Sequence, residues 1–262
     1  MNGVQDISWM DLATGYLLLL IPILVFRYYQ TGMIRSTLIA VLRMSIQLYL
    51  VGLYLQYIFD LNSHWINIGW VLIMIVIASL TAISRSGLSW KLFLLPILAA
   101  MLLSVFAIDM YFLGVVLKLD YLFDARYFIP ITGMLIGNCM SNIIIALNTF
   151  YKSLDRAQAQ YRFALANGAA RGEALRPFIA EALRKSLNPT IATTSVVGLI
   201  SLPGMMTGQI LGGSDPAVAI KYQTMIMITI LVSSLITTVL SIAVSNSFVF
   251  DDMDMPAKKI LH

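Results

Sequence analysis

Long apolar segments alternate with short polar ones along almost the whole chain. A helix needs about 20 apolar residues to cross a hydrocarbon core about 30 Å thick, and seven segments come close to or exceed this length. They are residues 9–26, 37–59, 66–83, 92–117, 127–150, 190–211 and 222–247. None has the strict alternation of apolar and polar residues that a membrane-spanning β-strand requires. The pattern therefore predicts an all-α polytopic membrane helix bundle that forms a single transmembrane domain.

The overall composition agrees with a membrane protein and excludes other classes. Hydrophobic residues make up 59% of the 262 residues and charged residues 11%, against roughly 25% charged residues in soluble domains. The single cysteine, Cys139, excludes a disulfide scaffold, and the apolar content excludes a disordered chain. The net charge of +4 is a weak signal of nucleic-acid binding until the basic residues are located. Because they lie mainly in loops on one side of the predicted bundle, we expect a lipid bilayer around this chain and no nucleic-acid partner.

Basic residues in the predicted loops set the orientation of the spans, because cytoplasmic loops carry an excess of Lys and Arg. The loops on one side carry 13 of the 17 basic residues, seven of them between Lys152 and Lys185. The loops on the other side carry three, and Arg43 lies within a span. The sequence therefore predicts a multi-pass protein of the plasma (inner) membrane, with its N-terminus outside and its C-terminus in the cytoplasm.

Residues 152–189, which we call the polar hairpin, form the one long polar stretch and are too charged to cross the membrane. Apolar residues recur there at helical spacing, and Gly168 and Gly172 separate two short amphipathic helices. Such a hairpin could lie on the lipid headgroups, with Arg171 and Arg176 facing lipid phosphate. It could equally dock into a soluble partner, and charge alone leaves both alternatives open.

Sequence motifs of catalysis are missing from the chain. It contains no G-x-x-x-x-G-K-[ST] phosphate loop, no H-E-x-x-H motif and no Cys/His cluster. No span combines Ser, His and Asp in the manner of a hydrolase. We therefore expect a carrier or a transporter subunit rather than an enzyme, with no cofactor held by this chain.

Two polar residues, Arg43 and Gln47, lie one helical turn apart within the second predicted span. They share a helix face and are candidates for the wall of a translocation path. Alternatively, Arg43 extends its side chain to the cytoplasmic surface, which its position two turns from Arg35 favours. Asp109, in the outer half of the fourth span, fits either an acidic residue near the outer exit or a capped helix end.

The fifth span holds the richest polar cluster. The Gly133-x-x-x-Gly137 spacing lets another helix backbone approach closely. Asn138 and Asn142 place two amides on one face near the middle of the bilayer, where they must face protein or water. They either join helices by hydrogen bonds or line a pathway, together with Met134 on the same stripe and Met140 on a neighbouring one.

The sixth span contains a helix-breaking pair, Pro203 and Gly204, at which we expect the helix to kink or unwind beside a cavity. Met134 and Met205 come at similar depths, so we predict that they face one another across one pocket and are its candidate metal ligands. Thioethers are soft ligands that suit copper(I) best. Packing is the alternative role for these two residues and for Met140 and Met206. Gln223 either anchors the seventh span at the outer interface or faces the pathway.

Five separated motifs between about residues 37 and 250 resemble one family, the FetB-like membrane subunits of ABC-type metal exporters, whose members are linked to iron export in bacteria and aluminium sensitivity in plants. The first span and the acidic tail Asp251–Asp254 contribute nothing to this resemblance. The motifs are Leu42-Arg43-x-x-Ile46-Gln47-Leu48, Pro130-Ile-x-Gly133-Met134-x-x-Gly137-Asn138-x-Met140, Leu165-x-x-Gly168-Ala169, Gly198-Leu-x-Ser201-Leu-Pro-Gly-Met-Met-x-Gly208 and Asp215-Pro216-x-x-Ala219-Ile220-Lys221-Tyr222-Gln223.

The resemblance implies that the polar hairpin contacts a separately encoded ABC ATPase subunit, which binds ATP and Mg. It also implies a working unit of two copies of this chain with two ATPase subunits. The Glu-Ala-Ala that often opens the coupling pattern is replaced by Arg162-Phe163-Ala164, which leaves the docking residues open. The expected coupling residues are Tyr161, Ala164, Leu165, Gly168, Ala169, Arg171 and Pro177.

The cargo implied by the resemblance is iron or a related metal ion. Fe(II) prefers carboxylate or imidazole ligands, however, and the predicted membrane core offers only Asp109, so a chelate or another small solute is an alternative. Two other classes stay open. One is a self-powered secondary carrier or channel that uses Arg43 and Asp109 as coupling charges, and the other is a membrane scaffold that transports nothing.

Overall fold

The computed structural model describes residues 7–251 and 254–255, and every regular element among them is helical. This confirms the predicted all-α membrane bundle. The elements are α1 (Trp9–Gly15), the 3-10 turn η1 (Tyr16–Leu19), α2 (Leu20–Tyr28), α3 (Ile34–Leu61), α4 (His64–Ser86), α5 (Trp90–Tyr111), the π-helical turn η2 (Phe112–Val116), α6 (Ala125–Arg156), α7 (Gln158–Ala166), α8 (Arg171–Val196), α9 (Gly204–Leu211) and α10 (Pro216–Val249).

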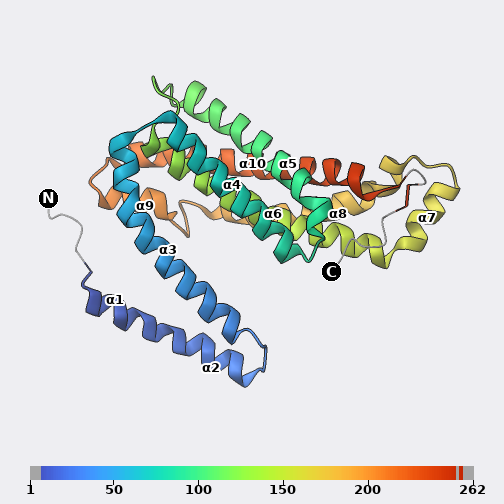
Figure 1. Ribbon diagram of the computed structural model, residues 1–262, viewed down its shortest axis with the longest axis horizontal. Helices are drawn as coiled ribbons and strands as arrows, with labels where there is room; N and C mark the ends of the chain where they lie inside the picture. The colour runs from blue at the N-terminus through green and yellow to red at the C-terminus, as the bar shows by residue number, and fades with distance from the viewer. Residues whose placement is uncertain (1–6, 252–253, 256–262) are drawn as a thin grey trace.

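The packed bundle consists of α4, α5, α6, α8 and α10 (Figure 1). Small hydroxyl residues on the buried face of α10, such as Ser233 and Thr237, let α10 approach α5 and α6 closely. The hydroxyl groups of Thr237 and Ser104 form a hydrogen bond between α10 and α5. Aromatic residues fill the end of the core near the polar hairpin, where Phe93 of α5 contacts Tyr151 of α6 edge-on.

The first three helices form an arm that stands away from the bundle (Figure 1). Ile58 is the one buried residue of α1–α3 among the described residues, and it packs with Ala125 and Ile129 of α6. Asn62 ends α3 in the left-handed conformation, and its side-chain oxygen accepts a hydrogen bond of 2.9 Å from the backbone N–H of Ala125. The arm is therefore fixed to the bundle near one end of α3 and free along the rest of its length.

Six helical segments of the described chain are long and apolar enough to cross a membrane: Trp9–Tyr28, Ile34–Leu61, His64–Ser86, Trp90–Val116, Ala125–Arg156 and Pro216–Val249. The remaining predicted span, residues 190–211, is divided. Helix α8 ends at Val196, the chain turns through Gly198 at a φ of +87°, and α9 begins at Gly204 after Pro203. The predicted break at Pro203 and Gly204 is therefore the end of a longer one, which covers residues 197–203.

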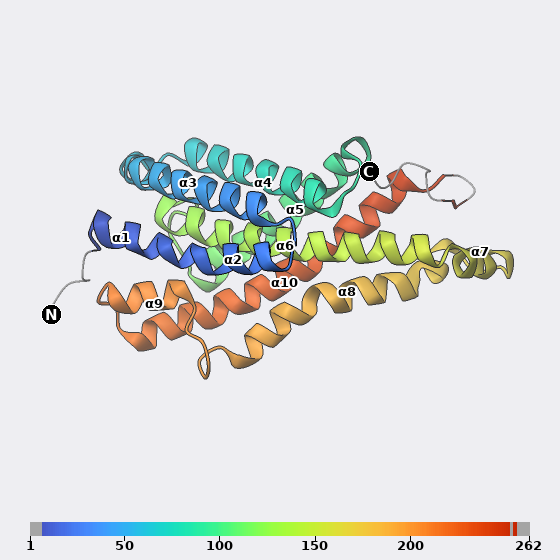
Figure 2. The same ribbon diagram turned by 90° about the horizontal axis from the view of Figure 1, so that it is seen from below.

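The polar hairpin differs from its prediction at both ends. Its first residues, 152–156, are the end of α6. Its second helix is not short, because it is the first part of the 26-residue helix α8, which includes Gly172 and continues into the bundle. Gly168, with a φ of +88°, reverses the chain between α7 and α8. Figure 2 shows α6 and α8 running side by side to α7 at one end of the molecule, while α9 lies at the other end.

Candidate substrate pathway

A cavity of about 400 Å³ lies between α6, α8, α9 and α10 and contains most of the predicted pathway residues. Residues from four distant parts of the sequence meet there, including the two methionines that the sequence placed at matching depth. The lining residues are Met134, Asn138, Ser141, Asn142, Ile145, Pro189, Thr190, Thr193, Val197, Ser201, Pro203, Gly204, Met205, Gln223, Ile226, Met227 and Ile230.

The amides in this cavity are partly satisfied by the protein. The side-chain NH₂ of Asn138 donates to the carbonyl of Met134 at 2.8 Å, and that of Asn142 donates to the carbonyl of Asn138 at 3.1 Å. Asn142 also approaches the hydroxyl of Thr190 in α8 at 3.4 Å. Gln223 is buried, and its Oε1 has no hydrogen-bond partner within the described part of the chain. The cavity therefore offers polar groups to water or to a solute.

The donor set of this cavity is neutral. Its polar groups are amides and hydroxyls, and Met134, Met205 and Met227 add three thioethers. Among the described residues, no group of three or more His, Cys, Asp or Glu side chains could hold a metal ion. Thioethers are weak ligands for most metals. The chemistry suits the passage of a hydrogen-bonding solute better than the tight binding of a metal ion.

The structure places the other predicted pathway residues elsewhere. Met206 lines an adjoining cavity of about 480 Å³, which shares Val197, Gln223 and Met227 with the first. Met140 is half-buried and packs against the bundle core. Arg43 and Gln47 are exposed on α3, in the arm, and do not line the cavity of their own chain.

A second cavity, of about 520 Å³, continues along the same face of α6 towards the polar hairpin. Ile145 lines both cavities, so the two adjoin. Both cavities lie along one face of α6, and we call the two together the α6 groove. The residues of the second cavity are Ile144, Ile145, Asn148, Thr149, Lys152, Ser153, Arg156, Glu181 and Lys185.

The second cavity and the contribution of Thr190 and Thr193 were not predicted from the sequence. The available signal was the spacing of three or four residues that continues from Met134 through Ile145 to Arg156 on one helix face. That spacing runs past residue 150, at which the predicted span ends.

Asp109 is buried against α4 and α6, not exposed at an outer exit. The hydroxyl of Thr132 donates to its Oδ2 at 2.6 Å, and its Oδ1 has no hydrogen-bond partner in the described residues. Its surroundings are a small apolar cavity of about 160 Å³ that is separate from the α6 groove.

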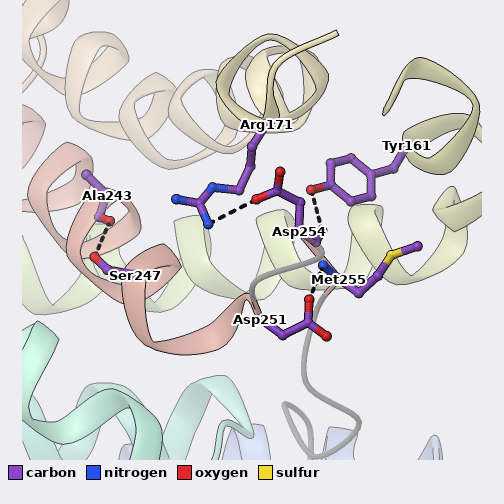
Figure 3. A network of polar contacts seen from close by, with 7 residues as sticks. All are labelled: Tyr161, Arg171, Ala243, Ser247, Asp251, Asp254 and Met255. Atoms are coloured by element: carbon purple, nitrogen blue, oxygen red, sulfur yellow. Dashed lines mark hydrogen bonds and ion pairs between the residues drawn. The ribbon is translucent and has the colours of Figure 1, made fainter. Parts of the chain in front are cut away.

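Two predicted coupling residues contact the chain's own C-terminal segment (Figure 3). The hydroxyl of Tyr161 in α7 donates to the carbonyl of Asp254 at 2.8 Å. Arg171, at the start of α8, forms an ion pair of 3.2 Å with the Asp254 carboxylate and stacks over the ring of Phe250 at 5.8 Å. Burial, and then the negative charge of Asp254, raise the pKa of Tyr161, so its phenol stays a donor at physiological pH. Tyr161 is therefore buried by the tail and not exposed for a partner.

The remaining predicted coupling residues have different surroundings. Ala164 and Leu165 are half-buried, and both pack against the bundle core. Gly168 and Ala169 form the turn, and Pro177 is exposed in α8. The largest exposed apolar side chain of α7 is Phe163, at 70% exposure.

Comparison with known proteins finds relatives over most of the chain. It is 30% identical over 237 residues to the "Probable iron export permease protein FetB" of Escherichia coli (strain K12), covering 90% of each chain. It is 29% identical over 238 residues to the "UPF0014 membrane protein YjkA" of Bacillus subtilis (strain 168), covering 89% of this chain and 92% of the relative. It is 35% identical over 199 residues to the "Protein ALUMINUM SENSITIVE 3" of Arabidopsis thaliana, covering 72% of this chain and 67% of the relative.

No solved structure matches this chain. A family model matches residues 9–250, which begin at the start of α1 and end just after α10. With six long apolar helices and membrane-protein relatives on the same span of sequence, the chain is a multi-pass membrane protein that belongs to the "Uncharacterised protein family (UPF0014)".

Proposed function

We propose that this protein is the membrane-spanning permease subunit of an ABC-type exporter and that its solute moves along the α6 groove. The groove itself is the observation that carries the proposal. It consists of the mid-membrane cavity around Asn138 and, next to it on the same face of α6, a charged cavity at the end of the bundle that bears the polar hairpin. The relative from E. coli is named a probable iron export permease, which supports the transport class.

A second copy of the chain completes the path in this proposal. The groove is open along its side, where Ser141 and Ile145 are exposed. Gly133 and Gly137 lie on the same face, and a Cβ atom added at either would have no other part of the described chain within 4 Å. No other described helix of this chain therefore packs on this small-residue surface. A polar face at this depth cannot remain against hydrocarbon. Two copies that place their α6 grooves face to face would enclose it.

The polar hairpin is the proposed docking site for a soluble ATPase that binds ATP and Mg. Thr190 lies at the depth of Asn142, and the 19 residues back to Arg171 extend about 28 Å along α8. Since Asn142 lies about 13 Å inside the edge of a core about 30 Å thick that is centred on α6, α7 sits roughly 15 Å beyond the hydrocarbon. That distance exceeds the headgroup layer and favours a soluble partner over lipid.

Phe163 is the proposed anchor of this contact. It is exposed at the far end of the molecule, outside the depth at which an aromatic side chain meets lipid, and buried aromatic anchors carry much of the binding energy of protein interfaces. Gly168 lies on the adjoining turn, where a partner's backbone can approach closely.

Copurification with a candidate ATPase tests the proposal. Phe163→Ala is expected to weaken binding of the ATPase at least about tenfold, as loss of an interface anchor does. Phe248→Ala is the matched control, because Phe248 is exposed at the end of α10 and lies outside the hairpin. Equal loss of binding in both variants, or solute transport by the purified chain without any ATPase, would contradict the proposal. The second outcome is the one that a self-powered carrier requires.

A further inference from the structure

The cavity at the hairpin end of the α6 groove has a basic lining. Lys152 and Arg156 of α6 and Lys185 of α8 face it, against one acidic residue, Glu181. Glu181 is already neutralised by Lys185, because their charged atoms lie 2.7 Å apart. Within the described part of the chain, no ion pair engages Lys152 or Arg156. Two positive charges therefore remain uncompensated at this mouth of the groove.

Nearby acidic residues do not alter this balance. Asp155 is next to Arg156 in sequence, but it does not line the cavity, and it accepts a hydrogen bond of 3.3 Å from Gln158. Arg184 precedes Lys185 on α8 and is exposed outside the cavity. Any solute that moves between the hairpin side and the mid-membrane cavity passes the basic lining before it reaches Asn142.

A cavity with this basic lining selects solutes by their charge. Like-signed groups that line a cleft concentrate counter-ions near it and repel ions of their own sign. The mid-membrane cavity then offers neutral amides and hydroxyls from Asn138, Asn142 and Thr190, which can donate hydrogen bonds to oxygen atoms of a solute. Neither cavity presents the carboxylate or imidazole groups that a bare divalent cation prefers, apart from the paired Glu181.

We propose that the transported solute is an anion that bears carboxylate or phosphate groups, or a metal ion carried inside a negatively charged chelate, rather than a bare metal cation. The inference rests on the proposed function, since it requires the α6 groove to be the path. It reconciles the iron export named for the E. coli relative with a cavity that has no hard metal ligands.

An anionic phospholipid is the other source of the same chemistry. Ile144 and Ile145 lie next to the basic residues on the membrane side, so a lipid phosphate could sit at Lys152 with its acyl chain along α6. The two sources predict different effects of the surrounding bilayer on solute binding. A lipid headgroup would make solute binding depend on the charge of the surrounding bilayer, and a solute would bind equally in a zwitterionic one.

The test measures binding of inorganic phosphate, citrate and iron(III)–citrate to the purified chain in phosphatidylcholine nanodiscs, with Mn²⁺ as the bare cation. Lys152→Gln and Arg156→Gln should each weaken binding of at least one anionic probe about fivefold, and the loss should shrink at high salt. Glu181→Gln should strengthen it, because one negative charge leaves the cavity. Arg184→Gln, an exposed neighbour outside the cavity, should have no effect.

Three results would overturn the proposal. The first is binding of all three anions that is insensitive to Lys152→Gln and Arg156→Gln. The second is saturable Mn²⁺ binding that these substitutions strengthen. The third is that Lys152→Gln and Arg156→Gln change only the retention of phosphatidylglycerol, in nanodiscs made with that lipid. No ATPase is needed for these measurements, so a failure to bind an ATPase would contradict the proposed function and leave the anion site standing.

Discussion

Replacing Tyr161 by Phe removes one hydroxyl group from the contact between the polar hairpin and the C-terminal segment. This hydroxyl donates to the carbonyl of Asp254 at 2.8 Å, and the ring that remains still packs edge-on against Phe250 at 6.0 Å. One intramolecular hydrogen bond contributes about 0.5–1.5 kcal/mol net. Local opening of the segment should therefore become about 2- to 12-fold more frequent.

Amide hydrogen exchange of Asp254 and Met255 in nanodiscs measures this opening directly. Arg171→Ala should have an effect of similar size, because it removes a surface ion pair of about 0–1 kcal/mol and a cation–π contact of about 0.5–1 kcal/mol. Asp254→Asn should have a smaller effect, because it keeps the carbonyl that Tyr161 binds. Arg176→Ala, on an exposed part of α8, is the matched control and should change nothing.

The same contact gives a pH dependence with a definite sign. Burial and the carboxylate of Asp254 raise the pKa of Tyr161, so the neutral phenol is favoured in the folded protein. Its contribution is fully present below the ordinary tyrosine pKa of about 10 and is lost as the pH rises through the raised value. Protection of the Asp254 amide should fall in that range in the natural chain and not in Tyr161→Phe. Equal exchange rates in both proteins at every pH would show that the contact does not form.

Four further substitutions address the groove. Met134→Ala and Met205→Ala should each lower solute-stimulated ATP hydrolysis by the partner, and unchanged turnover in both would reject the cavity between them as the path. Gln223→Leu should raise the thermal midpoint, since it removes a buried acceptor that lacks a partner in the described chain, while transport falls; a lower midpoint would contradict the burial argument. Gly137→Leu should weaken association of two copies in a crosslinking assay, and Gly69→Leu, on an equally open position of α4, should not.

The helical membrane bundle followed from the sequence because each span must satisfy its own backbone in hydrocarbon, and this leaves a strong local pattern. Positions counted from the span ends predicted similar depths for Met134 and Met205, and both residues do line one cavity. The break before Gly204 was also accessible, because proline acts on its own preceding turn.

Contacts between helices left no comparable signal. Arg43 and Gln47 share a helix face, but the sequence of one helix does not indicate which other helix that face will contact. In the structure both residues lie on the arm, away from the groove of their own chain. Lys152 and Arg156 were assigned to the polar hairpin because charges usually end a span. Helix α6, which is about 48 Å long in all, instead continues to Arg156, past the end of the predicted span at residue 150. The link from Tyr161 to Asp254 joins residues 93 positions apart, which no periodicity encodes.

Solute flux in reconstituted vesicles is the measurement that decides whether transport by this membrane protein is driven by ATP hydrolysis in a soluble partner. Vesicles that contain this chain with its ATPase should move an anionic solute only when ATP is supplied on the side of the polar hairpin. Vesicles that contain the chain alone should show no flux with or without a membrane potential. Flux through the chain alone, driven by an ion gradient, would contradict a subunit that depends on a partner.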